Sequence, residues 1–69
     1  MIRTGTEVKW TWGSGTATGK VTEIFKETVS RTIKGNKVTR NGSDEDRAFL
    51  IEQEDGDKVL KLESEVERA

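Results

Sequence analysis

The residues of this sequence best suited to binding chemistry are two tryptophans near the start of the chain. Trp10 and Trp12 lie two positions apart, so a β-strand places both rings on one face. Exposed indole rings stack on nucleic acid bases and attract cations. Catalytic chemistry has little support, because the sequence contains no histidine, cysteine or tyrosine. We therefore predict no enzyme, no catalytic residue, no cofactor and no metal site.

Basic side chains form a second candidate group. Residues 1–40 carry eight lysines and arginines against three acidic residues, whereas residues 41–69 carry four against ten. In a compact fold these halves neutralise one another, which is the interpretation we favour. The alternative is a basic strip that, with an exposed tryptophan, binds single-stranded nucleic acid. The strip would consist of Lys20, Lys26, Arg31, Lys34, Lys37 and Arg40.

The four aromatic residues offer few rings for a recognition site. A cage for a methylated ammonium group needs three or four converging exposed rings. Trp10 and Phe49 lie within apolar faces and are predicted core residues. Trp12, near a strand end, and Phe25, near an expected bulge, remain as candidates for a contact surface.

Two other motifs have simpler interpretations. The glycines of residues 13–20 do not form a phosphate loop, because Ser14 and Val21 stand where that motif needs a glycine and a hydroxyl. The acidic residues at 44–46, 55 and 57 do not follow the order of a calcium-binding EF-hand. We interpret them as solvated loop tips.

The elements that must position these side chains are short β-strands. Val21 and Ile24 are three residues apart, which breaks strict alternation and predicts a bulge between them. The apolar run 48–51 predicts a central strand covered on both faces, and Asp55-Gly56 predicts a hairpin turn. Alternation and turn residues together predict five strands, over residues 7–12, 16–26, 28–34, 47–54 and 58–62.

The remaining segments are expected to be turns and loops. Gly35-Asn36 predicts a turn, followed by a short extended piece over residues 37–40. Residues 43–46 predict a loop with no more than one helical turn, for which Ser43 is the candidate N-cap. Residues 63–69 form either a single helical turn or a short terminal strand.

These strands predict an all-β fold, a small five-stranded SH3-like barrel, with an open meander as the alternative. The chain of 69 residues is expected to be one domain over residues 1–69, with its core at about 5–67. The predicted buried residues are Val8, Trp10, Val21, Ile24, Val29, Ile33, Val38, Phe49, Ile51, Val59, Leu60, Leu62 and Val66.

Several motifs resemble the hypervirulence-associated Tudor-like domain family, along residues 4–68. The most specific are Trp10-x-Trp12-Gly13, the Ile33-Lys34-Gly35 step, residues 39–43, and residues 48–51 running into Asp55-Gly56. The resemblance implies a small SH3-like, Tudor-type barrel, found mostly as a stand-alone bacterial protein and also in fungi. It implies no catalytic or ligand-binding residue at any position here.

The leading functional hypothesis is a non-catalytic binding module for a protein or peptide. The alternatives are single-stranded nucleic acid binding through the basic strip with Trp12, and a stress-related accessory role without a dedicated ligand. No apolar run is long enough to span a membrane and no signal peptide is evident, so we expect a cytoplasmic protein, a monomer by default. The candidate partner-binding residues are Trp12, Phe25, Lys20, Arg31, Lys34 and Arg40.

Overall fold

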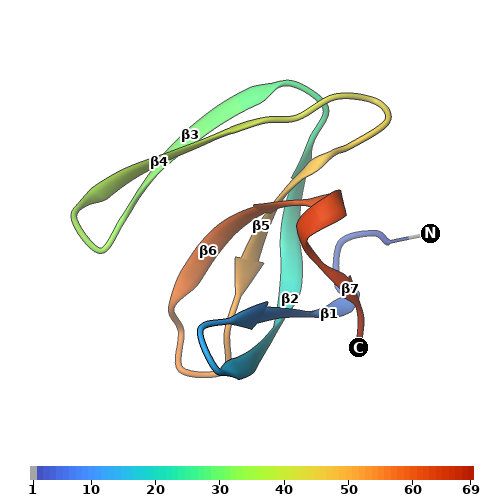
Figure 1. Ribbon diagram of the computed structural model, residues 1–69. Coiled ribbons are helices and arrows are strands. Elements are labelled where there is room, and N and C mark those ends of the chain that lie inside the picture. Colours follow the sequence, from blue (N-terminus) through green and yellow to red (C-terminus); the bar gives the residue numbers. More distant parts are fainter. Residues whose placement is uncertain (1) are drawn as a thin grey trace.

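The computed structural model describes residues 2–69, and these residues form β-strands joined by turns and one short helical turn (Figure 1). The all-β prediction is therefore confirmed. No helix in this part of the chain is long and apolar enough to cross a membrane. The strands are β1 (Glu7–Trp12), β2 (Gly15–Phe25), β3 (Thr28–Ile33), β4 (Asn36–Asn41), β5 (Ala48–Glu52), β6 (Lys58–Leu62) and β7 (Glu67–Arg68), and the 3₁₀ turn η1 (Glu63–Glu65) lies between β6 and β7.

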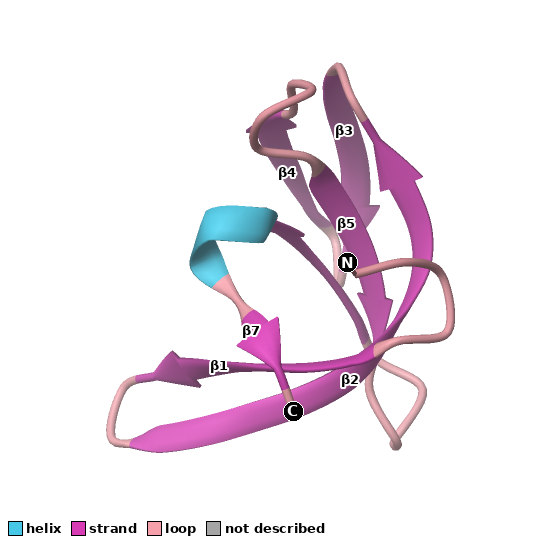
Figure 2. Cartoon of the chain, turned by 90° about the vertical axis from the view of Figure 1, so that its right-hand side faces the viewer, coloured by secondary structure: helices cyan, strands magenta, loops and turns pink. Residues whose placement is uncertain are grey.

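Five of the strands form one antiparallel sheet in the order β6-β5-β2-β1-β7. The β1–β2 and β5–β6 pairs are hairpins, and η1 leads the chain from β6, at one edge of the sheet, to β7 at the other edge. The long strand β2 curves between its two partners (Figure 2). Within residues 2–69, β6 and β7 remain the two edges, so the expected closed five-stranded barrel is not confirmed.

The other two strands form a separate hairpin, which among the described residues is not hydrogen-bonded to the main sheet and packs against β6 (Figure 1). The expectation that residues 28–34 supply a barrel strand was wrong, because β3 pairs only with β4. The short piece expected over residues 37–40 is a full partner strand. Ile33 pairs with Asn36 across a two-residue turn in which Lys34 and Gly35 have φ values of 50° and 79°. A two-residue turn with positive φ at both positions has the twist that two antiparallel strands require. This turn therefore favours direct pairing of β3 with β4.

The predicted bulge is confirmed in β2. Val21 pairs with Ile51 and Glu23 pairs with Leu50, so Thr22 is the extra residue. The Thr22 hydroxyl donates a hydrogen bond to the Leu50 carbonyl oxygen at 3.1 Å, which occupies the polar group that the bulge frees. The bulge lets Val21 and Ile24 face the same core despite their odd spacing.

The sheet has a hydrophobic core on each face, and β5 contributes to both. We define the first core as Ile2, Val8, Trp10, Val21, Phe49 and Ile51, and the second core as Val29, Ala48, Leu50 and Leu60. Because Phe49 and Ile51 point to one side and Ala48 and Leu50 to the other, the prediction of a doubly covered strand is confirmed. The hairpin supplies Val29 and, partly buried, Ile33 and Val38 to the second core.

The buried residues differ from the predicted set at a few positions. Ile2, Ala48 and Leu50 are buried but were not expected in the core. Six expected core residues are only partly buried and pack at the margins of the two cores: Ile24, Ile33, Val38, Val59, Leu62 and Val66.

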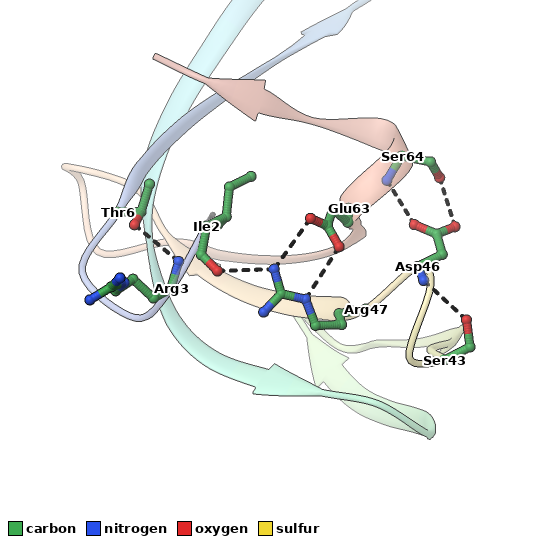
Figure 3. Close-up of polar contacts among 8 residues, drawn as sticks. All are labelled: Ile2, Arg3, Thr6, Ser43, Asp46, Arg47, Glu63 and Ser64. Carbon is green, nitrogen blue, oxygen red and sulfur yellow. Dashed lines mark hydrogen bonds and ion pairs between the residues drawn. The ribbon is translucent and has the colours of Figure 1, made fainter.

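A buried arginine fixes the C-terminal segment on the sheet (Figure 3). Arg47, 9% exposed, donates to both carboxylate oxygens of Glu63 at 3.2 Å and to the Ile2 carbonyl oxygen at 3.0 Å. Its guanidinium also lies 5.3 Å from the ring centre of Phe49. These bonds hold the pKa of the Glu63 carboxyl below its ordinary value. Arg47 thereby ties η1, the first core and the N-terminal segment together.

The residues next to Arg47 add to this fixation. The Asp46 carboxylate accepts hydrogen bonds from the backbone N–H and the hydroxyl of Ser64, both at 2.8 Å. The Ser43 hydroxyl accepts from the Asp46 N–H, as an N-cap would, although residues 43–46 form a bend and no helix. Both alternatives for the C-terminus are realised, because the helical turn η1 is followed by the short strand β7.

Candidate binding surface around Trp12

Trp12 is exposed although it shares a strand face with a buried tryptophan. Its side chain is 64% exposed, the one large hydrophobic residue in that state among residues 2–69, whereas Trp10 is 6% exposed. The difference follows from position, because Trp12 is the last residue of β1 and lies beyond the covered part of the sheet. The indole lies against its cross-strand partner Gly15, where an added Cβ would be 3.9 Å from the ring. The ring therefore has support from its own hairpin.

A hollow of about 360 Å³ lies beside Trp12. Its apolar lining comes from β1, β2 and β6, and its polar lining comes from β6 and the β5–β6 loop. Apolar surface with a few polar groups is the composition of many ligand-binding pockets. The lining residues are Trp10, Trp12, Ala17, Gln53, Asp55, Asp57, Val59 and Lys61.

The two aspartates at this hollow differ in their electrostatic environment. Asp57 forms an ion pair with Lys34 at 2.7 Å, and this hydrogen bond and charge raise the pKa of Lys34. Asp55 accepts a hydrogen bond from the Asp57 backbone N–H at 3.0 Å, but within residues 2–69 no cation lies within 4 Å of its carboxylate. The hollow thus presents an indole face, the Asp55 carboxylate and the ammonium of Lys61.

The basic residues expected to form a strip are mostly engaged by acids. Arg31 lies 4.0 Å from Glu23, Arg40 lies 3.0 Å from Glu65, and Lys26 lies 3.9 Å from Asp44. Lys34 is held by Asp57, as described above. Lys20 and Lys37 have no carboxylate within 4 Å in the part of the chain that the structure describes. Three of the pairs join residues 1–40 with residues 41–69, which agrees with the interpretation that the two halves neutralise one another.

The acid of the Arg40 pair has further bonds. Partial burial opposes the charge on Glu65, but hydrogen bonds from the Leu62 N–H and from Arg40 outweigh it and lower the pKa of Glu65. Arg40, on β4, is therefore bound to the C-terminal turn η1 and is not free to form a basic strip.

The candidate residues do not gather in one place. Phe25 packs at the second core with the Arg31 guanidinium 4.9 Å from its ring centre, away from the Trp12 hollow. Phe49 is completely buried. An aromatic cage is thus not formed around Trp12. Of the other candidates, Lys34 reaches the Trp12 hollow through Asp57, while Lys20 lines a different hollow on β2.

The β5–β6 loop is the part of this surface that sequence reasoning missed. Its Asp-Gly turn is confirmed: Gly56 has a φ of 88°, and Gln53 and Asp57 are joined by a backbone hydrogen bond. No local signal places that loop beside Trp12, because its position depends on the order of the strands. The acidic loops show no group of three or more metal-ligating side chains within residues 2–69. Glu23, Glu52 and Glu54 are all exposed.

Comparison with known protein families adds to this picture. The family described as hypervirulence-associated proteins Tudor domain matches residues 5–66. The chain belongs to this family. The resemblance found in the sequence is therefore confirmed, and the small all-β domain agrees with it. Neither a curated protein nor a solved structure matches the chain. Membership of this Tudor-domain family indicates a small binding module and names no ligand.

Proposed function

We propose that this Tudor-family domain is a non-catalytic binding module that recognises a protein or peptide at Trp12. The observation that carries the proposal is the exposure of Trp12 beside a preformed hollow. An exposed indole on a rigid strand loses little conformational entropy on binding, and tryptophan is enriched among the residues that dominate protein interfaces. The apolar lining and the indole face suit an apolar or cationic side chain of the partner.

The charge distribution favours a protein or peptide over nucleic acid. Phosphate binding needs several uncompensated cations. Of the six residues of the expected strip, Lys26, Arg31, Lys34 and Arg40 each lie within 4.0 Å of a carboxylate, which leaves Lys20 and Lys37. The net charge of −1 adds no long-range attraction for a polyanion.

The proposal also covers the type of barrel, the location of the domain and its oligomeric state. The strand order β6-β5-β2-β1-β7 supports an SH3-like half-barrel in which the β3–β4 hairpin is an added arm. We propose that the half-barrel carries the binding surface and that the domain acts in the cytoplasm as a monomer.

Affinity purification with matched variants tests the proposal. Wild-type protein, Trp12→Ala and Lys37→Ala are immobilised, and proteins captured from a bacterial lysate are quantified by mass spectrometry. A specific partner should be lost with Trp12→Ala and retained with Lys37→Ala, because Lys37 is exposed on the separate hairpin. Equal capture by all three proteins would contradict a role for Trp12 and would leave the accessory role without a dedicated ligand as the better account.

The nucleic acid alternative is tested by titration. Tryptophan fluorescence is followed while single-stranded RNA or DNA is added at two salt concentrations. We expect no change at either concentration. A change at low salt that disappears at high salt would support the alternative, because phosphate contacts are salt-dependent.

A further inference from the structure

The outer edge of β1 is covered by another strand over only part of its length. β7 pairs with β1 at Val8 and Lys9, and η1 then carries the chain away (Figure 2). β1 continues to Trp12. Within residues 2–69 the outer side of Trp10–Trp12 therefore has no strand partner. At the opposite edge of the sheet, β4 lies against β6.

The register identifies which backbone groups face this open edge. The Ala69 N–H donates to the Glu7 carbonyl oxygen at 3.0 Å, which places the polar backbone groups of Glu7 on the β7 side. Backbone groups of alternate residues point the same way in a strand, so those of Lys9 and Thr11 face that side too. Lys9 is opposite Glu67, whereas Thr11 is opposite no residue of β7. The Thr11 N–H and C=O are thus free to pair with another strand.

A second hollow, of about 340 Å³, runs along this open edge. One wall consists of β1 and β2 and the other consists of η1 and the start of β7. The second wall is fixed, because Asp46 and Arg47 hold η1 from the side of β5. The lining residues are Lys9, Trp10, Thr11, Thr16, Ser64, Glu65, Val66 and Glu67.

The length of the open edge favours a bound peptide over a second copy of the chain. The free segment of three residues is about 10 Å long at roughly 3.3 Å per residue. A stable dimer buries on the order of 1,200 Å² or more, which so short an edge does not provide. A single extended peptide needs only a few backbone bonds and a side-chain pocket.

We propose that β1 binds an extended peptide segment of a partner protein as an added β-strand, paired to Thr11 and running past Trp12. This inference rests on the proposed function, for which it names the binding mode. Side chains alternate between the faces of a strand. Peptide residues on the Trp10 and Trp12 face should be apolar or cationic, and those on the Thr11 and Thr16 face should be small and polar.

The test uses a phage-displayed library of random twelve-residue peptides, selected on the wild-type domain. Individual synthetic peptides are then measured against three variants. Thr11→Pro removes the outward N–H at an edge position where proline is tolerated. Thr11→Ala removes only the side chain and is the matched control, whereas Trp12→Ala tests the proposed function by itself.

We expect Thr11→Pro to weaken peptide binding at least tenfold and Thr11→Ala to change it less than threefold. In the wild type, exchange of the Thr11 amide hydrogen should slow at least tenfold when the peptide is bound. That wild-type measurement decides the question even if Thr11→Pro does not fold. Affinity lost with Trp12→Ala but kept with Thr11→Pro, with unchanged Thr11 exchange, would overturn strand addition and leave the proposed function standing. Equal losses with Thr11→Ala and Thr11→Pro, again with unchanged exchange, would overturn strand addition too. Failure to select any peptide that distinguishes Trp12→Ala would overturn both.

Discussion

Arg47 offers the sharpest test of how the sheet and its C-terminal segment are held together. Replacing it by methionine keeps an apolar stem over Phe49 and removes the guanidinium. The Glu63 carboxylate then loses two hydrogen bonds of 3.2 Å, and the Ile2 carbonyl oxygen loses one of 3.0 Å.

The expected cost follows from these contacts. Hydrogen bonds to charged groups contribute about 1.5–3 kcal/mol each, and breaking a fully buried ion pair costs about 3–5 kcal/mol. Arg47 is nearly buried, but the Glu63 side chain is 33% exposed, so water replaces part of what is lost. We expect Arg47→Met to lower the free energy of unfolding by about 2–3 kcal/mol. In a domain of this size, that change lowers the melting temperature by roughly 10–20 °C.

The measurement is urea unfolding followed by tryptophan fluorescence. Arg68→Met is the matched control, because Arg68 is an exposed arginine on β7 without an ion pair in the described part of the chain. Its effect should stay below about 0.5 kcal/mol. A cost for Arg47→Met no larger than that of the control would refute the argument. The double variant with Glu63→Gln should lose little more than Arg47→Met alone, because both changes break the same pair.

Three further predictions concern packing, pH and the hairpin. Gly19→Ala should destabilise the domain by about 1–3 kcal/mol, because the new Cβ would lie 2.6 Å from the Ile51 side chain and 2.8 Å from the Glu52 carbonyl oxygen. Gly15→Ala, whose nearest atom is 3.9 Å away, should cost less than about 0.5 kcal/mol in the same urea titration, and equal effects would refute the close-packing argument. Because the pKa of Glu63 is lowered from 4.5, the stabilisation from its pair with Arg47 should be complete above pH 4.5 and decline as the pH falls through the lowered value. Unfolding free energies measured across this range should decline less steeply for Arg47→Met than for the wild type, and identical slopes would contradict the assignment. Lys34→Met removes the ion pair to Asp57 and should speed hydrogen exchange in the β3–β4 hairpin, whereas Lys37→Met should not; unchanged exchange in both variants would show that the pair does not hold the hairpin.

Local patterns predicted the elements whose causes are local. The odd spacing of Val21 and Ile24 indicated the bulge at Thr22, and the continuous run 48–51 indicated a strand covered on both faces. The Asp55-Gly56 pair indicated the β5–β6 turn. In each case the signal and the structure depend on neighbouring residues of the same segment.

Features that depend on distant parts of the chain were not predictable in this way. The β3–β4 turn itself is local, and the sequence pattern placed it one residue too late, at Gly35-Asn36. No local pattern showed that, within residues 2–69, β3 pairs with no strand of the five-stranded sheet. The burial of Ile2 and Arg47 follows from the contacts that η1 makes after β6. Alternation gives both tryptophans the same face, and only the position of Trp12 near the strand end made it a candidate for a contact surface. Its exposure could not be settled from the sequence, because it depends on where the elements that cover the sheet end.

The most direct test of the proposed binding surface is a chemical-shift titration of the labelled wild-type domain with a peptide from the selection. Our account predicts that shifts concentrate on the indole N–H of Trp12 and the backbone amides of residues 9–13, with smaller shifts in the β5–β6 loop. Shifts confined to the basic residues of the β3–β4 hairpin, with the Trp12 indole unchanged, would contradict it.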